Sequence, residues 1–230
     1  MCILSNVNYD DENEIYYISD YHQYWLYDKN YEKQRNPEFD NYNGGYILDV
    51  KNNKSSGLNY YTEQLEKIIN VNDELLNNNW IINLIPSHKV NTFGKGLYLI
   101  TKTLADKYPN IKYEQYIYRK SEIDKLSSGG NRNVEIQLKS LGIYKNCKEK
   151  ILNSNIILID DVTTTANSFI AARKVLYKSN AKNVICIALG KTVPRKTYEE
   201  VMEEYDDVYD SNLYKPNYVD CEDIDDFFSF

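Results

Sequence analysis

Short apolar runs alternate along this chain with segments in which apolar residues recur at helical spacing. The runs within Trp80–Ile85, Ile156–Ile159 and Asn183–Leu189 show little polar alternation, which is typical of strands buried on both faces of a parallel sheet. Further strands are predicted at Tyr46–Val50 and Ile111–Tyr118. Strands that alternate with helices predict an α/β fold with a doubly wound, mainly parallel sheet.

The helices are predicted from apolar residues spaced three and four apart. They cover about residues 60–71, a segment around Leu97–Ala105, residues 168–178 and an acidic segment at 198–205. The segment 121–144 is predicted to be a mobile loop with a short helix.

Composition along the chain predicts three parts. Residues 1–45 are polar and rich in tyrosine, so we expect an irregular N-terminal extension or hood with a short helix near Tyr21–Tyr27. Residues 46–192 form the predicted α/β core, and residues 193–230 an acidic helix and tail.

Charge and cysteine content narrow the class of protein. Lys and Arg total 27 against 34 Asp and Glu, a net charge of −7, so nothing marks a general nucleic-acid binder. Cys2, Cys147, Cys186 and Cys221 are widely spaced without a CxxC pair, which indicates free thiols in a reducing compartment, with Cys186 in the core. No secretory signal or membrane-spanning run is visible, so a cytoplasmic protein is expected.

The candidate site with the clearest pattern follows the predicted strand Ile156–Ile159. Asp160 and Asp161 end the apolar run, and a loop rich in hydroxyl groups leads into the next predicted helix. The loop residues are Thr163, Thr164, Thr165, Ala166, Asn167 and Ser168. The first amides of a helix favour a bound phosphate, whereas carboxylates suit sugar hydroxyls or Mg²⁺. The alternative is a well-capped helix beside two solvated acids.

The segment Leu158–Ser168 resembles the signature with which type I phosphoribosyltransferases bind PRPP (5-phosphoribosyl 1-pyrophosphate). It matches that pattern except at Ala166, where the family has glycine. The resemblance implies that Asp160 and Asp161, the candidate catalytic residues, face the ribose hydroxyls, while the loop holds the 5′-phosphate. It also implies Mg²⁺ carried by PRPP, with either acid reaching the ion through water. Because alanine keeps the N–H donor but adds a methyl group, we expect binding to be weakened or shifted.

A second loop follows the predicted strand Trp80–Ile85. Ser87, His88 and Lys89 bring a hydroxyl, an imidazole and an ammonium group to a strand end, where they can bind an oxyanion. The resemblance implies that this loop holds pyrophosphate. Gly94–Leu97 loosely resembles a segment of the ComF-like, competence-associated branch of the family. The alternative for His88 is an exposed or structural histidine.

Cations in the segment between these two loops are the third feature. The resemblance implies that Arg119, Lys120 and Arg132 belong to a mobile loop that closes over the reacting sugar and supplies positive charge to the leaving pyrophosphate. The alternative is a solvated charged loop.

The acidic tail Asp220–Phe230 ends in phenylalanine and is similar to acidic tips that recruit protein partners. The alternatives are docking on the core or disorder. A homodimer is neither indicated nor excluded by the sequence.

Three functions follow from these features. The first is an enzyme that transfers the phosphoribosyl group of PRPP to a base nitrogen and releases pyrophosphate. The second is a non-catalytic PRPP- or nucleotide-binding regulator of DNA uptake or processing that acts through protein partners. The third is an α/β scaffold that has lost ligand binding.

Overall fold

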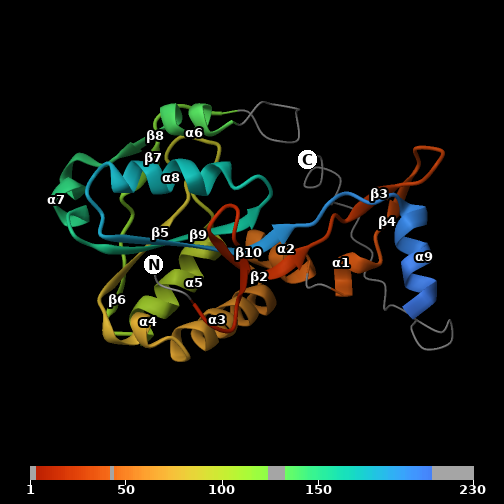
Figure 1. Cartoon of the computed structure of the whole chain (residues 1–230), viewed down its shortest axis with the longest axis horizontal. Coiled ribbons are helices and arrows are strands. Elements are labelled where there is room, and N and C mark those ends of the chain that lie inside the picture. The colour runs from red at the N-terminus through yellow and green to blue at the C-terminus, as the bar shows by residue number, and fades with distance from the viewer. Residues whose placement is uncertain (1–3, 42–43, 124–132, 209–230) are drawn as a thin grey trace.

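The computed structural model describes residues 4–41, 44–123 and 133–208, and a mainly parallel sheet lies at its centre (Figure 1). In the described residues this sheet has six strands in the order β1-β2-β10-β9-β5-β6. Their bounds are β1 Asn8–Asp10, β2 Ile15–Tyr21, β5 Trp80–Leu84, β6 Ile111–Tyr113, β9 Asn155–Thr163 and β10 Asn183–Thr192. The edge strand β1 is antiparallel to β2, and the other neighbours are parallel. The predicted doubly wound sheet is therefore confirmed.

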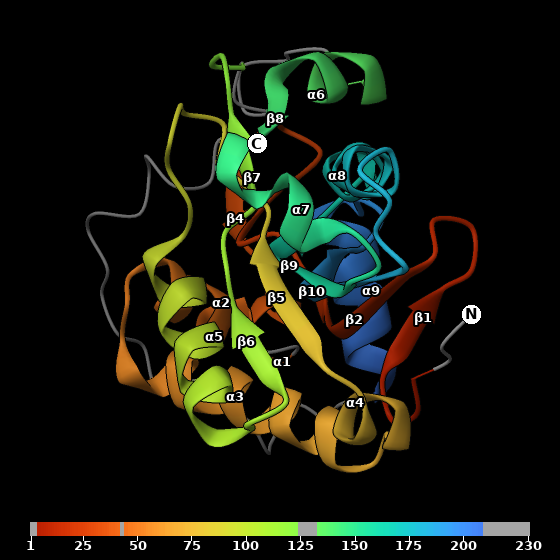
Figure 2. The same ribbon diagram turned by 90° about the vertical axis from the view of Figure 1, so that its left-hand side faces the viewer.

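Helices cover both faces of the sheet, as Figures 1 and 2 show from two sides. The bounds of the helices on the first face are α2 Gly44–Lys51, α3 Ser55–Asn70, α4 Asp73–Asn77 and α5 Lys95–Lys107. The opposite face carries α6 Val134–Ser140, α7 Lys148–Ile151 and α8 Asn167–Tyr177. The short helix α1 Glu38–Asn41 adds Phe39 to the cluster on the first face, and α9 Tyr198–Val208 lies apart from these layers. No helix within the described ranges is long and apolar enough to cross a lipid bilayer.

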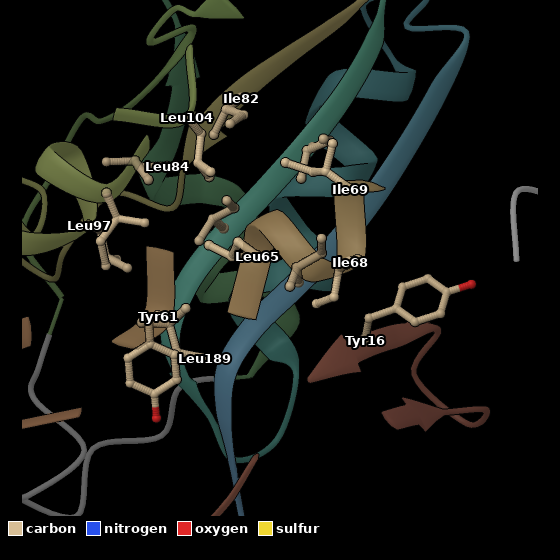
Figure 3. Packing of buried hydrophobic residues seen from close by; sticks show 14 of the residues in the cluster. Tyr16, Tyr61, Leu65, Ile68, Ile69, Ile82, Leu84, Leu97, Leu104 and Leu189 are labelled. Atoms are coloured by element: carbon tan, nitrogen blue, oxygen red, sulfur yellow. The ribbon is translucent and has the colours of Figure 1, made fainter. Parts of the chain in front are cut away.

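Each face of the sheet has its own buried cluster. On the first face, Leu65 of α3 and Leu97 of α5 pack with Leu84 of β5 (Figure 3). On the opposite face, Phe169 and Leu176 of α8 are buried against the sheet. Residues alternate between the faces along β9, which explains why its apolar run has no polar positions.

The two described thiols belong to the cluster on the opposite face. Cys186 is in β10 and Cys147 precedes α7, and both are buried and free. The expectation that Cys186 belongs to the core is confirmed. Cys2, Cys221 and the acidic tail lie outside the described residues.

The prediction of a strand at Tyr46–Val50 is wrong, because this segment belongs to helix α2. Ile47 and Val50 are buried three residues apart, which is helical spacing. Gly57 of α3 allows a close approach, since a Cβ there would collide with the carbonyl group of Tyr46. Tertiary packing against α3 thus outweighs the strand preference of a short aliphatic run.

The N-terminal segment is also more regular than expected. The predicted helix near Tyr21–Tyr27 is wrong, because β2 ends at Tyr21 and β3 covers Trp25–Tyr27. Strand β3 pairs with β4, Lys33–Arg35, in a separate antiparallel sheet. Strand β2 joins the central sheet beside β10, so that sheet extends into the segment expected to be an extension.

The strand predicted at Ile111–Tyr118 is divided in two. β6 ends at Tyr113, and β7, Ile117–Arg119, pairs instead with β8, Leu141–Ile143. The Gln115 side chain lies between them and hydrogen-bonds both the N–H and the carbonyl group of Leu84. Because this amide takes the place of the next backbone pair, the parallel ladder with β5 ends there.

Candidate functional site

The candidate site is a cavity of about 270 Å³ at the carboxyl ends of β5 and β9. These neighbouring strands lead in opposite directions: β5 continues through α5 to β6, and β9 continues through α8 to β10. Their helices also lie on opposite faces of the sheet. Such a reversal opens a crevice between the two following loops, which is where ligands bind in open α/β sheets. The loop after β5 is joined to β9 at its first residue, since the Ile85 N–H donates to the Ile159 carbonyl at 3.0 Å.

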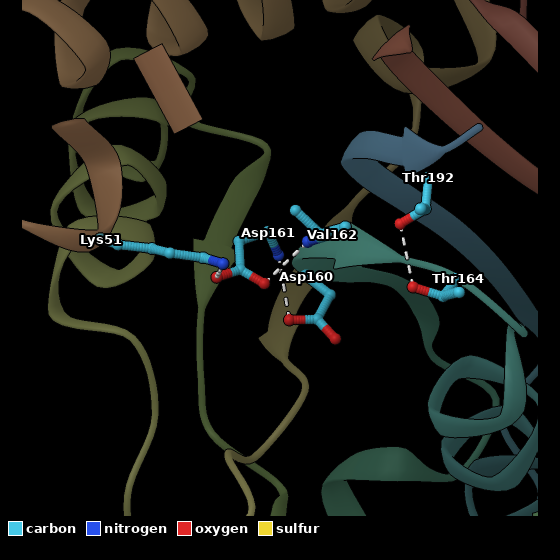
Figure 4. Close-up of polar contacts among 6 residues, drawn as sticks. All are labelled: Lys51, Asp160, Asp161, Val162, Thr164 and Thr192. Carbon is cyan, nitrogen blue, oxygen red and sulfur yellow. Dashed lines mark hydrogen bonds and ion pairs between the residues drawn. The ribbon is translucent and has the colours of Figure 1, made fainter. Parts of the chain in front are cut away.

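The acid pair lines this cavity from within the last part of β9, which continues past the acids to Thr163 instead of ending at Ile159 (Figure 4). One oxygen of each carboxylate accepts a hydrogen bond from the next backbone N–H, at 2.9 Å for Asp160 and 2.7 Å for Asp161. Burial, followed by the charge of Asp161, raises the pKa of Asp160 well above its ordinary value. Asp160 therefore holds a proton more readily than an exposed aspartate would.

Lys51, which the sequence did not indicate, is the partner of this pair. It is the last residue of α2, and its Nζ lies 3.7 Å from the Asp161 Oδ2 (Figure 4). Burial alone lowers the pKa of Lys51, but the negative charges of Asp161 and Asp160 outweigh burial and the pKa is raised. The ammonium group thus stays charged at the wall of the cavity.

The loop from β9 to α8 forms a second wall. Thr163 is buried and Thr164 and Thr165 are exposed, and the Thr164 hydroxyl hydrogen-bonds Thr192 of β10 at 2.9 Å. Ala166 is buried and adopts the left-handed conformation, with φ 60° and ψ −3°, immediately before α8. This conformation favours glycine, the residue that the phosphoribosyltransferase pattern has here. Asn167 and Ser168 begin α8, so its first amides face the cavity that both residues line.

The loop after β5 forms the facing wall. Ser87 closes a turn with Thr92, both through its N–H at 2.9 Å to the Thr92 carbonyl and through a contact between the two hydroxyl groups. Ser87 and His88 line the cavity. Lys89 is exposed and is not part of the lining. Of the three residues predicted to bind an oxyanion, Ser87 and His88 therefore line the same cavity as the acid pair, and Lys89 does not.

Arg119 holds this loop in place. Its guanidinium group donates to the carbonyl groups of Ser87 at 2.9 Å and Pro86 at 3.0 Å. It also donates to the side chains of Gln137 and Ser140 of α6. Arg119 lies in β7 and is only 2% exposed, so the expectation that it is a cation of a mobile loop is wrong. Its role is to join the loop after β5 to α6.

The structure describes one of the other two predicted loop cations, Lys120. Lys120 is exposed and is not among the lining residues, and its backbone N–H pairs with the Ser140 carbonyl. Arg132 lies outside the described residues.

A second cavity of about 650 Å³ adjoins the first at the ends of β2 and β10. Val162 and Thr164 line both cavities. Tyr21, Val193 and Pro194 give the second cavity apolar walls, and Gln23 and Arg195 add polar groups. The Tyr21 hydroxyl is buried without a hydrogen-bond partner in the described structure. No sequence motif indicates this cavity, because its lining comes from segments that are distant along the chain.

The described carboxylates and imidazoles are not grouped as a preassembled metal site. Among the described residues, no three His, Cys, Asp or Glu side chains are grouped as metal ligands. Asp160 and Asp161 supply carboxylate oxygens, and Mg²⁺ often has only one or two such ligands beside phosphate oxygens. The acid pair therefore suits an Mg²⁺ ion that arrives with a phosphorylated ligand.

Comparison with known proteins gives no family for this chain. No family model and no curated protein matches it. Solved structures with some similarity include a hypoxanthine phosphoribosyltransferase from Staphylococcus aureus, 13% identical, which covers 65% of this chain and 76% of its own with a TM-score of 0.36. They also include adenine phosphoribosyltransferase from Leishmania donovani, 11% identical over 96% of this chain and 98% of its own, with a TM-score of 0.41. The functional argument therefore depends on the residues of the site.

Proposed function

We propose that this protein binds Mg-PRPP, or a related ribose 5-phosphate compound, in the cavity between β5 and β9. The observation that carries the proposal is that one cavity is lined by the acid pair, the first residues of α8 and the Ser87–His88 turn. The acids suit ribose hydroxyls, and the α8 amides suit the 5′-phosphate. The Ser87–His88 turn would contact the pyrophosphate.

The ion would be held mainly by PRPP, with Asp160 or Asp161 reaching it through water. When bound, Mg²⁺ neutralises phosphate charge that the two carboxylates would otherwise repel. The protein's own part is to orient the ribose against the acid pair and to keep the phosphate on the α8 amides.

We further propose that the phosphoribosyl group is transferred to a base nitrogen. The bond between the ribose C1 and pyrophosphate would break through an oxocarbenium-like state, and the base nitrogen would form the new bond to C1. Positioning and charge stabilisation would supply most of the rate enhancement. The adjoining cavity of about 650 Å³ supports the transfer reaction, because an acceptor base could occupy it beside the proposed ribose site.

A second candidate function is non-catalytic binding of PRPP or a nucleotide, with regulation through protein partners. The burial of Arg119 favours it, because a guanidinium group held by Pro86, Ser87 and α6 cannot move to close over a leaving pyrophosphate. The ComF-like role and the tail as a partner peptide remain predictions of this second candidate.

Two measurements test these functions. Calorimetric titration with PRPP and Mg²⁺ should show binding to the unmodified protein and none to the double variant Asp160→Asn, Asp161→Asn. Undiminished affinity in the double variant would refute the site assignment. Pyrophosphate release should then be measured with a panel of purine and pyrimidine bases. Release with one base supports transfer, and binding without release across the whole panel supports the regulator.

A further inference from the structure

Lys51 brings a positive charge to the cavity that the two carboxylates line. Its Nζ lies 3.7 Å from Asp161 Oδ2 and its side chain is partly buried. The sequence pattern at β9 does not require this lysine, since Lys51 comes from α2 on a distant part of the chain. Its presence among the lining residues therefore needs its own explanation.

The position of Lys51 is built by close packing. A Cβ on Gly96 of α5 would collide with the backbone carbonyl of Val50, so the start of α5 lies directly against the end of α2. Lys51 follows Val50, and the negative end of the α2 dipole favours a cation there. The Tyr21 ring lies on another side of the ammonium group, with 5.9 Å between Nζ and the ring centroid. These contacts direct the charge toward the acid pair.

The charge of the proposed ligand gives Lys51 a function. PRPP carries a pyrophosphate group, and Asp160 and Asp161 would repel it. The described residues that line the cavity include one lysine, Lys51, and one arginine, Arg119. Arg119 donates to Pro86, Ser87 and α6, which directs its hydrogen bonds to the protein itself.

We propose that Lys51 is a ligand-binding residue that exchanges Asp161 for a pyrophosphate oxygen of PRPP. The exchange frees the Asp161 carboxylate to accept a hydrogen bond from a ribose hydroxyl. Recognition of the pyrophosphate and of the sugar is then coupled through one ion pair. This inference rests on the proposed PRPP binding, and it adds that a ligand without pyrophosphate does not engage Lys51.

The test compares PRPP with ribose 5-phosphate, which lacks the pyrophosphate group. Calorimetric titration with Mg²⁺ should show that Lys51→Met weakens PRPP binding at least about tenfold, as expected for the loss of a charge-assisted hydrogen bond. The affinity for ribose 5-phosphate should change by no more than about twofold. Lys51→Arg keeps the charge and should retain PRPP binding within about threefold.

Lys54→Met is the matched control. Lys54 lies three residues further along the chain, pairs with Asp49 at 3.5 Å and is not a lining residue, so neither affinity should change. If circular dichroism shows that Lys51→Met is unfolded, Lys51→Gln takes its place, with the same expected loss for PRPP.

The outcomes separate the inference from the proposed function. An unmodified protein that binds neither compound overturns both. PRPP binding that is equal in the unmodified and Lys51→Met proteins overturns the inference and leaves the proposed function intact. An equal loss for both compounds in Lys51→Met also overturns it, because that result assigns Lys51 a structural role.

Discussion

Gly96 and Val50 are in direct backbone contact, and this contact joins the start of α5 to the end of α2. A Cβ on Gly96 would collide with the Val50 carbonyl group, for which there is no flexible side chain to move aside. A segment that was predicted to be a strand and a predicted helix are therefore two helices in one packed unit. This contact matters for the site because Lys51, which lines the cavity, directly follows Val50.

Gly96→Ala should destabilise the protein by about 1–3 kcal/mol, because the added methyl group forces the two helices apart. The free energy of urea unfolding measures this change. Gly94→Ala is the control: a Cβ there would lie 3.5 Å from Leu97 Cδ1, an ordinary contact. A loss of stability in the control as large as that in Gly96→Ala would contradict this account of the contact.

Ala166→Gly should change stability by less than about 1 kcal/mol, because opposing effects nearly cancel. Glycine removes the strain of the left-handed conformation, worth about 1–2 kcal/mol, but loses a buried methyl group and adds flexibility to the unfolded chain. Ala172→Gly is the same chemical change inside α8, where no strain is relieved, so it should cost at least about 1 kcal/mol. Thermal unfolding of both variants would detect the difference, and equal losses would contradict the strain at Ala166.

Arg119→Met should destabilise the protein by at least about 3 kcal/mol, because it leaves buried acceptors without their donor. These acceptors include the Pro86 and Ser87 carbonyl groups and the Gln137 side chain. Chemical denaturation measures the loss. Lys120→Met, at the exposed next position, should stay within about 0.5 kcal/mol of the unmodified protein. A mild effect of Arg119→Met would mean that Arg119 does not hold the loop after β5.

Asp160→Asn should make the protein more stable at neutral pH. The pKa of Asp160 is raised in the folded state, so the folded protein binds this proton more tightly than the unfolded chain does. Stability therefore falls as pH rises from the unfolded pKa, about 4, through the folded pKa, and asparagine removes this loss. The charged groups that act on this carboxyl are Asp161, which raises its pKa, and Lys51, which lowers it by less.

Urea midpoints between about pH 3 and pH 8 check the sign, with the advantage of Asp160→Asn growing as pH rises above about 4. Asp106→Asn, a change at an exposed ion pair with Lys102, should show no such growth. Parallel pH profiles for Asp160→Asn and the unmodified protein would refute the burial of a charged carboxyl here.

The elements that the sequence predicted well are those with long, unambiguous patterns. The structure confirms the strands β5, β9 and β10, which were predicted from apolar runs. It also confirms the helices α3, α5 and α8, which were predicted from helical spacing. Predictions for short segments were wrong where tertiary contacts determine the secondary structure. The aliphatic residues of Tyr46–Val50 favour a strand, yet the segment packs as a helix against Gly57 and Gly96.

The site was predictable where the motif is continuous and not where distant segments meet. The acid pair and the loop that follows it are adjacent in sequence, so a pattern can show them together. Lys51 was missed because its segment was assigned to a strand, although the spacing of Ile47 and Val50 and a lysine after them are signals of a helix end. Arg119 was assigned to a loop because the break after β6 and the pairing of β7 with β8 are long-range features.

The hydrogen bond from the Ile85 N–H to the Ile159 carbonyl has a consequence for how a ligand would be received. It continues the ladder between β5 and β9 past the last residue of β5, so the loop after β5 leaves the sheet directly beside the strand that carries the acid pair. A ligand that contacts both loops would meet a backbone that is already rigid at this point, so binding would cost little conformational entropy there. Selectivity at this part of the site then depends on a backbone shape that is fixed before the ligand binds.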